Sequence, residues 1–457
     1  MKIRKLQLKN IGVFDDETIE FQPCPVKDKA EIHIFTGQNG SGKTTLLMAL
    51  GSAFDGNPLP SLKNSLYKRM KRINEVEGDD EIKNQIYVLF ENEVFSNIEI
   101  SKKANFVNSV DVLNRTSRSD FVSLHSSLAE YKHQFLLTTS SPNPLTFAVF
   151  ALSGYRHIEN EPVQANYLPK EFNPLSQSLE FIKDYRKDGE ITINQLVTNN
   201  ISNRALSKED KSFIEAEKYD AVINAIESFI KDVTDYEVKF VLKRSPNELK
   251  LRIHNKELDF DVLPDGLRSL ISWVADLLGR VDLLKWQDDL PITDKNLILL
   301  LDEIEVHLHP AWQRRVLPVV QKLFKNSQIF VSTHSPFVVN SIDNAWVYEL
   351  KVENGKAKVA EKSLTKTAYS YQTVLREVFD IDERFGEGTE KKGTQFQLDE
   401  FYKQRDKILK TNGKSRISKK KFLEFAENLA SQSAELQSLV FLELARLSKE
   451  KGEPYEI

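Results

Sequence analysis

Alternating apolar and polar residues predict β-strands in the N-terminal part of the chain. Residues 2–14 and 17–21 predict an opening pair of strands, and residues 86–101 predict further antiparallel strands. Residues 31–36 also alternate and contain β-branched side chains, which favours a strand. We therefore expect this region to be rich in β-sheet.

Helical periodicity is the dominant pattern in the middle of the chain. Residues from about 174 to 231 are predicted to be helical, with Ser207 before Glu209 and Asp210 as a helix start. Residues 267–284 place apolar side chains on one face and predict a strongly amphipathic helix. These segments predict a helical lobe inserted between strands.

A hairpin and a helical C-terminus complete the pattern. Residues 236–260 predict a β-hairpin with its turn at Pro246 and Asn247. Beyond about residue 365 the chain is charged and is predicted to be helical to its end. We expect a domain boundary at that point.

Two apolar segments, within residues 297–301 and 327–339, predict strands of a parallel sheet together with the strand before the phosphate-binding loop. Residues 145–158 predict a further buried strand, and all these segments lead into polar residues. With the helical segments between them, they predict an α/β core that has helices on both faces. Ligands of such sheets bind at the carboxyl ends of the strands, so the polar residues that follow these runs are the candidates for a site.

The segment 34–50 carries a specific motif. Gly37 is followed by four residues and then by Gly42, Lys43 and Thr44. Glycines permit a tight loop whose backbone N–H groups turn toward phosphate oxygens. Lys43 is expected to reach the outer phosphates, and the Thr44 hydroxyl is expected to ligate Mg²⁺. The expected nucleotide-binding residues of this loop are Gly37, Asn39, Gly40, Ser41, Gly42, Lys43, Thr44 and Thr45.

Two carboxylates follow the apolar run 297–301. Asp302 is expected to hold Mg²⁺, and Glu303 is placed to activate a water for attack on the γ-phosphate. His334 follows the next apolar run, where an imidazole can hydrogen-bond a γ-phosphate oxygen and report its presence. The alternatives are structural: a helix cap or solvated turn for the two acids, and a strand-end histidine without a ligand.

Composition narrows the class of protein. The chain has 457 residues, of which 40% are hydrophobic and 28% charged, and this predicts a soluble, ordered protein of two or three lobes. A net charge of −4 argues neither for nor against a nucleic-acid partner. The single cysteine, Cys24, excludes an intrachain disulfide and indicates a reducing compartment. The sequence shows neither a signal peptide nor a run of membrane-spanning length, so we expect a cytoplasmic protein without a membrane partner.

Three motifs, taken in order, resemble a known family. GQNGSGKTT, LLLDEIEVHLHP and STHSPF are similar to the motifs of ABC-type ATPases of the RecF, SMC and OLD-nuclease class. The resemblance implies ATP and Mg²⁺ as ligands. It also implies an α/β P-loop ATPase head with an antiparallel β lobe, an inserted helical lobe and a helical C-terminal segment. The expected parts are a P-loop half at 1–160, a helical insert at about 161–232, a signature and Walker B half at 233–365, and a C-terminal assembly or partner segment at 366–457.

The signature loop of this family has a counterpart before the amphipathic helix. Pro264, Asp265 and Gly266 occupy the place where transporters carry Ser-Gly-Gly. Because members of the family sandwich ATP between two head-to-tail subunits, the resemblance implies that Gly266 reaches the P-loop of the partner in trans. His307 and His309 then lie at the subunit boundary, in the D-loop position. Zinc binding by these histidines is the alternative, but the sequence offers no third ligand nearby.

Two features separate the chain from other branches of the family. It has no long coiled-coil segment, unlike SMC proteins. Its one Asp-x-Asp triplet, Asp380 to Asp382, follows a helical pattern rather than the strand that a TOPRIM nuclease needs. Arg156 in SGYRHI is the closest candidate for the family's glutamine loop. The chain therefore looks most like the ATPase subunits of bacterial anti-phage systems, first AriA of PARIS and next PtuA of Septu.

Two functions are compatible with these patterns. The first is an ATP-hydrolysing scaffold and sensor, slow and regulatory, that forms head-to-tail dimers and a higher homo-oligomer. It would respond to a phage trigger protein and control a separate effector nuclease of TOPRIM or HNH type. The alternative is a RecF-like DNA-repair ATPase that acts directly on DNA. The basic runs 63–72 and 413–421 suit that alternative, but charge runs are usually solvated surface, so a nucleic-acid partner is compatible and not required.

The C-terminal segment carries apolar residues on recurring helical faces. They are Phe422, Phe425, Leu429, Leu436, Leu439, Phe441, Leu444 and Leu447. Such faces pack on their own core, join subunits or hold an effector, and the sequence leaves these three roles open.

Overall fold

The computed structural model describes most of the chain. The described residues are 1–54, 84–91, 94–100, 106–112, 118–134, 143–153, 163–164, 167–168, 172–176, 178–179, 191–244, 247–379, 393–410 and 419–457. The chain divides into two compact units, Met1–Phe379 and Asp380–Ile457. The boundary follows Phe379 rather than residue 365, because helix α9 (Tyr371–Phe379) packs against α8 (Pro336–Val339) of the first unit.

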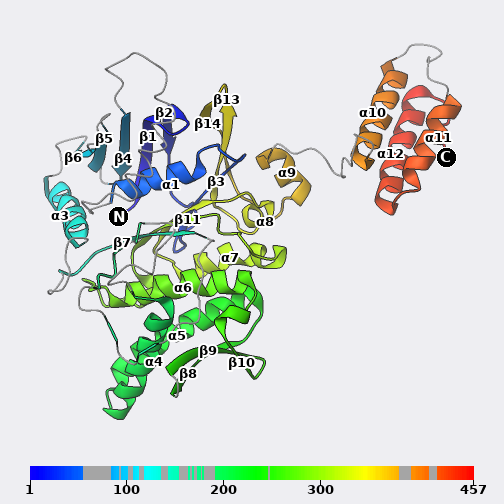
Figure 1. Ribbon diagram of the computed structural model, residues 1–457. Helices are drawn as coiled ribbons and strands as arrows, with labels where there is room; N and C mark the ends of the chain where they lie inside the picture. The colour runs from blue at the N-terminus through cyan, green and yellow to red at the C-terminus, as the bar shows by residue number, and fades with distance from the viewer. Residues whose placement is uncertain are drawn as a thin grey trace. The chain divides into compact units, whose positions relative to one another are not determined.

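A six-stranded sheet forms the centre of the first unit (Figure 1). The strand order is β14-β13-β3-β12-β11-β7, and all strands except β14 run parallel. Every residue of β7, β11 and β12 is buried, which explains the unbroken apolar runs in their sequences. The strands are β3 (Glu31–Gly37), β7 (Ala148–Ser153), β11 (Leu297–Asp302), β12 (Gln328–Ser332), β13 (Trp346–Glu353) and β14 (Lys356–Leu364).

A five-stranded antiparallel sheet lies on one side of the central sheet. Its order is β2-β1-β4-β5-β6, and helix α1 lies on the side of the central sheet that faces it (Figure 1). The predicted opening pair and the strands at 86–101 are therefore confirmed. The elements are β1 (Ile3–Ile11), β2 (Phe14–Glu20), α1 (Lys43–Ser52), β4 (Asn84–Phe90), β5 (Val94–Ile100), β6 (Phe106–Val112) and α3 (Arg118–Gln134).

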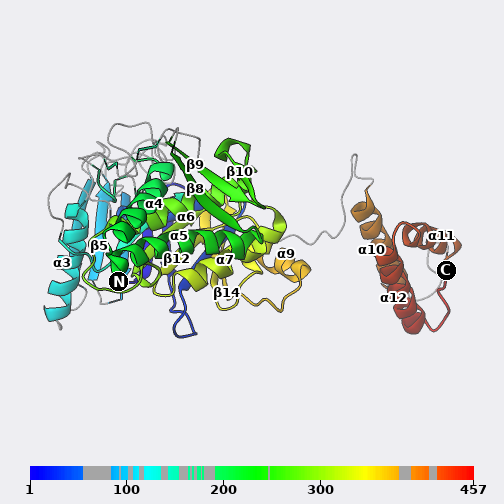
Figure 2. The ribbon, with the colours of Figure 1, turned by 90° about the horizontal axis from the view of Figure 1, so that it is seen from below.

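Helices cover the other face of the central sheet, as Figure 2 shows from below. They are α4 (Ile193–Glu209), α5 (Phe213–Thr234), α6 (Asp265–Leu283) and α7 (Pro310–Leu323), and they lie beside the small sheet of β8 (Val238–Arg244), β9 (Asn247–Ile253) and β10 (Lys256–Leu258). The predicted hairpin and amphipathic helix are confirmed, except that Asn247 of the predicted turn begins β9 and pairs with Arg244, and Pro246 lies outside the described residues. The architecture is thus the α/β fold that the sequence predicts, with an antiparallel β lobe, a helical lobe and a helical C-terminal segment.

The predicted helix start at Ser207 is wrong. Helix α4 continues through Ser207 to Glu209, and α5 begins at Phe213 after Ser212. The carbonyl of Ser207 accepts a hydrogen bond from the Ser212 N–H at 2.8 Å, as part of the turn between the two helices. A serine followed by acids is a weak start signal, and packing of α4 against α5 and α6 overrides it.

In its described residues, 393–410 and 419–457, the second unit is a bundle of three helices with a core of its own. The helices are α10 (Thr394–Lys410), α11 (Lys419–Ala430) and α12 (Ala434–Lys451). Of the apolar residues predicted on helical faces, Phe422, Leu429, Leu436, Leu444 and Leu447 are buried in this core, whereas Phe441 is 44% exposed. Most of the apolar faces therefore pack on one another. Among the described residues, none of the helices combines the length and hydrophobicity needed to cross a bilayer.

Candidate functional site

Glycines shape the loop between β3 and α1. Gly42 has a φ angle of 97°, a left-handed conformation that other residues rarely adopt. A Cβ atom on Gly42 would lie 2.6 Å from the ring of Phe14, so a side chain has no room there. Gly37 and Gly40 also have positive φ angles, and Asn39 is exposed at the tip of the loop. The backbone therefore makes the tight turn that the motif predicts.

Lys43 begins α1 and turns its side chain back over the loop. Its ammonium donates hydrogen bonds to the carbonyl oxygens of Gly37 at 2.9 Å and Gln38 at 3.0 Å. Burial lowers the pKa of Lys43 to about 8, and nearby carboxylates, that of Asp302 first among them, oppose this shift. The amine is therefore a partly desolvated cation beside the loop, which suits a phosphate group as its ligand.

Two hydroxyl-bearing residues flank Lys43 and Thr44 in the loop motif. Ser41 is buried, and its Oγ atom has no hydrogen-bond partner among the described residues. A phosphate oxygen would supply the missing acceptor. Thr45 is also buried, and its Cγ2 atom lies 2.9 Å from the position that a Cβ atom on Gly12 would occupy. Thr45 therefore packs on the turn between β1 and β2.

Thr44 and Asp302 meet although they are 258 residues apart in the chain. Strand β12 separates β3 from β11, and the carboxyl ends of these parallel strands lie at one edge of the sheet. The Thr44 Oγ1 atom lies 3.1 and 3.0 Å from the two carboxylate oxygens of Asp302. The Ser332 hydroxyl donates to the same carboxylate at Oδ1. A hydroxyl and a carboxylate are oxygen ligands of the kind that Mg²⁺ prefers, so this pair fits the ion.

Glu303 lies directly after β11 in a strained backbone conformation. Its φ angle is 51°, which is uncommon for residues other than glycine. The Glu303 N–H donates to the Ser332 Oγ atom at 2.9 Å, so Ser332 holds both acidic residues in place. Strained residues held by their surroundings cluster at functional sites, and this geometry agrees with a role for Glu303 in the site.

His334 lies close to Lys43 and Asp302. Burial lowers the pKa of His334, the charge of Lys43 lowers it further, and Asp302 acts in the opposite direction. The neutral form of the ring is therefore favoured, and this form can donate one hydrogen bond and accept another. The structure thus brings together the P-loop, Asp302, Glu303 and His334, as the sequence predicts.

Gly266 lies at the start of α6, and the segment that it contacts, at His307, belongs to the same chain. A Cβ atom on Gly266 would lie 2.5 Å from the His307 carbonyl oxygen, so the close approach of these two segments already requires glycine. The proposed contact of Gly266 with a partner subunit stays a prediction. The His309 side chain caps α7 by accepting a hydrogen bond from the Ala311 N–H at 3.2 Å. The described residues hold no cluster of three or more His, Cys, Asp or Glu side chains able to bind a metal ion.

Several sequence-based candidates lie outside the described residues. They are Arg156, the triplet Asp380 to Asp382, the basic run 63–72 and residues 413–418 of the second basic run. Conversely, the structure adds Ser332 and Glu305 to the site, and sequence reasoning missed both. Ser332 ends a buried strand in register with the P-loop strand, which was a usable signal.

Two segments of the chain match known protein families, and each segment contains part of this site. Residues 1–75 match a family described as "AAA domain", and residues 161–340 match a family described as "AAA domain, putative AbiEii toxin, Type IV TA system". The first segment contains the P-loop, and the second contains Asp302, Glu303 and His334.

Named relatives agree with these matches. The chain is 31% identical to the "Retron Ec83 probable ATPase" of Escherichia coli over 214 residues, which are 46% of this chain and 37% of the relative. It is 24% identical to the "Septu protein PtuA" of Bacillus thuringiensis over 159 residues, which are 33% of this chain and 40% of the relative.

The chain is similar to AAA-type ATPases of retron and Septu systems. Its matched region spans well under half the length of these relatives. The predicted likeness to Septu ATPases is confirmed, and the likeness to PARIS ATPases stays a prediction. Among solved structures, an SMC head bound to the C-terminal winged-helix domain of ScpA matches 81% of this chain and all of its own, with 14% identity and a TM-score of 0.47.

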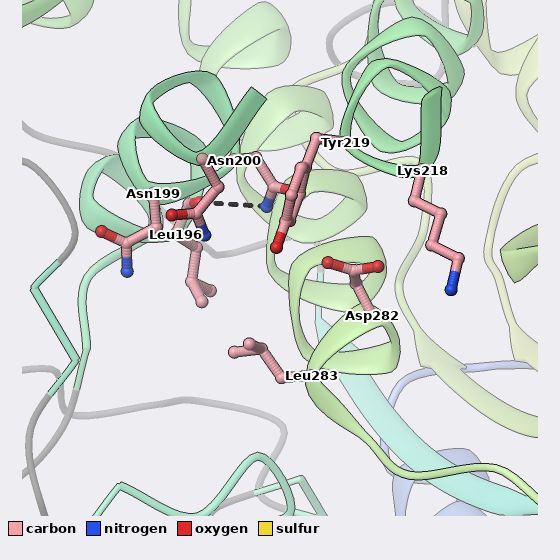
Figure 3. A pocket seen from close by; sticks show the side chains of 8 residues that line it. Leu196, Asn199, Asn200, Lys218, Tyr219, Asp282 and Leu283 are labelled. Carbon is pink, nitrogen blue, oxygen red and sulfur yellow. Dashed lines mark hydrogen bonds between the residues drawn. The ribbon is translucent and has the colours of Figure 1, made fainter. Parts of the chain in front are cut away.

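A polar cavity lies in the helical lobe of the first unit (Figure 3). It has a volume of about 340 Å³, and Asn200 of α4, Tyr219 of α5 and Asp282 of α6 line it. Asn200 is 6% exposed, and its Oδ1 atom has no partner among the described residues. Burial raises the pKa of Asp282 to about 6, and Lys218 opposes the shift only in part. The charged form of Asp282 therefore weakens the native state at neutral pH.

We expect Asp282→Asn to stabilise the protein at pH 7.5 by about 2 kcal/mol, and to have much less effect at pH 4. The folded state binds the Asp282 proton more tightly than the unfolded state does, because its pKa is raised. Wild-type stability is therefore lost as pH rises from about 4 to about 6, whereas the amide does not titrate. Urea unfolding at both pH values measures this, with Asp289→Asn at an exposed position as control. An equal effect of Asp282→Asn at both pH values would contradict the account.

Proposed function

We propose that the chain binds ATP with Mg²⁺ and hydrolyses it. The observation that carries the proposal is the contact of Thr44 with Asp302 at the carboxyl edge of the central sheet. In a P-loop site, Mg²⁺ is held by the Ser or Thr at the end of the phosphate-binding loop and by an aspartate that follows another strand. Thr44 and Asp302 are these two residues, and they are in contact. The matches to AAA domains on both sides of the contact support the same activity.

Each residue of the site then has a role. The loop from Gly37 to Thr45 surrounds the phosphates, and Lys43 contacts the outer ones. Mg²⁺, when bound by Thr44 and Asp302, neutralises the charge that develops on the phosphates. Glu303 accepts a proton from the attacking water, because its carboxylate follows Asp302 at the open edge of the sheet. His334 donates a hydrogen bond from its ring toward the γ-phosphate.

The proposal extends to a biological role. Relatives from retron and Septu systems support a place in anti-phage defence. We propose that the chain is the oligomeric scaffold and sensor of such a system, that it turns ATP over slowly, and that it controls a separate effector nuclease of TOPRIM or HNH type after a phage protein triggers it. Within the described residues, the charges of Asp302, Glu303 and Glu305 act on Lys43 of the phosphate-binding loop, so these acids belong to the proposed ATP site and leave the nuclease role to a separate protein.

The purified chain is expected to hydrolyse ATP and to leave DNA, RNA and tRNA intact, because the reactive side chains of its proposed site bind and hydrolyse ATP. Pull-down from cells that carry the native operon is expected to recover a nuclease with it. Phosphate release and nucleic-acid integrity on gels measure the first part, and mass spectrometry measures the second. Cleavage by the chain alone that disappears in Asp380→Ala/Asp382→Ala, with ATP binding unchanged, would overturn the division of labour.

A further inference from the structure

Glu305 is a partly buried acid that the proposed mechanism does not use. It lies two residues after Glu303, and its Oε1 atom accepts a hydrogen bond from the backbone N–H of His334 at 2.5 Å. The Thr333 hydroxyl is near enough to Glu305 to favour the charged form of its carboxylate. The Thr333 hydroxyl oxygen accepts the N–H of Ser335 at 3.0 Å. One side chain thus holds the backbone at the end of β12.

The position of the Glu305 carboxylate is unfavourable for the stability of the folded chain. Its Oε2 atom is buried and has no hydrogen-bond partner among the described residues. Burial raises the pKa of Glu305, the hydrogen bond from the His334 N–H and the nearby Thr333 hydroxyl lower it, and Glu303 raises it further. A carboxylate at this position is less favourable for stability than an apolar residue would be, unless its acceptor is needed. The acceptor serves the backbone that carries His334.

The loop that contains Glu305 is fastened at further points. Gln313 of α7 donates from Nε2 to the Leu308 carbonyl at 2.8 Å, and its Oε1 atom accepts the Ser335 hydroxyl at 2.6 Å. The next part of the loop, at His307, lies against Gly266 at the start of α6. The loop therefore joins the His334 segment to the start of α6 through a continuous set of contacts.

We propose that Glu305 is a positioning residue of the ATPase site, which fixes His334 toward the γ-phosphate through the hydrogen bond between its carboxylate and the His334 amide. The inference rests on the proposed ATPase function. Glu305 acts through His334 rather than on the reacting atoms, so the site needs its acceptor oxygen and not its negative charge. Glutamine keeps that acceptor at nearly the same place, and alanine removes it.

Steady-state ATP hydrolysis and fluorescent-nucleotide binding test the proposal on the full-length chain. Glu305→Ala is expected to lower kcat about 10- to 100-fold while Kd for ATP stays within about threefold, because the fault is misplacement of one catalytic group. Glu305→Gln is expected to remain within about threefold of wild-type kcat, since the amide oxygen can accept the same hydrogen bond. Glu361→Ala, at an exposed position of β14, is the matched control.

A double-mutant cycle separates positioning from a structural role. If Glu305 acts through His334, Glu305→Ala in a His334→Ala background is expected to cause no further loss of kcat. Full additivity of the two losses of kcat would overturn the proposal. A Glu305→Gln variant that is as inactive as Glu305→Ala would also overturn it, since the negative charge of the carboxylate would then be needed for the reaction. Unchanged kcat in a folded Glu305→Ala would overturn it as well. Lack of hydrolysis by the wild-type chain would instead refute the ATPase function, and this inference with it.

Discussion

Glu303→Gln is expected to lower kcat for ATP hydrolysis by about 10²- to 10⁴-fold while ATP still binds. Glutamine has almost the size of glutamate, and the Glu303 N–H that donates to Ser332 is unchanged, so the backbone at residue 303 is expected to persist. The amide cannot accept a proton from water, however. Only the step that needs a base is therefore lost, and the contacts of Thr44 and Lys43 remain.

Two measurements on the same protein check this expectation. Nucleotide occupancy after gel filtration reports binding, and phosphate release reports hydrolysis. Lys43→Ala is the contrasting variant, because loss of the ammonium over the loop is expected to abolish binding itself. Hydrolysis at the wild-type rate by Glu303→Gln would remove Glu303 from the role of base and direct attention to another group.

The central site was predictable from sequence because its parts are coded locally. The spacing from Gly37 to Thr44 specifies a phosphate-binding loop by backbone geometry alone. The runs that became β11 and β12 are fully buried, and a parallel sheet places the carboxyl ends of its strands at one edge. The meeting of Thr44 with Asp302 follows from these two facts, despite the separation in sequence.

The remaining contacts depend on tertiary structure. Glu305 looks like any acid in a polar loop, and its hydrogen bond to the His334 N–H exists only because two loops are packed together. The proximity of Gly266 to His307 likewise arises from the packing of α6 beside the loop that precedes α7. At Ser207 a local signal was present but packing of α4 overrode it. The apolar faces of the C-terminal helices had three open roles, and their burial in one core assigns most of them to the first.

The close approach of Gly266 to His307 changes how a shared site must be tested. Any side chain at position 266 would press on the loop that carries Glu303 and Glu305 in its own chain, so loss of activity there says nothing about a partner. Asp265 is a better position, because its side chain is 53% exposed at the start of α6. A tryptophan at position 265 would block the approach of another subunit and leave the contact of Gly266 with His307 intact.

Asp265→Trp and Lys43→Ala are each expected to abolish hydrolysis, and an equal mixture is expected to recover about a quarter of wild-type activity. In a head-to-tail pair, each site takes the P-loop from one chain and the start of α6 from the other. Half of randomly formed pairs contain both variants, and one of their two sites then has an intact P-loop and an intact Asp265. Phosphate release across mixing ratios measures this, after light scattering has shown that the chains co-assemble. If each site were complete within one chain, no ratio would restore hydrolysis, and the in-trans role of the α6 start would be rejected.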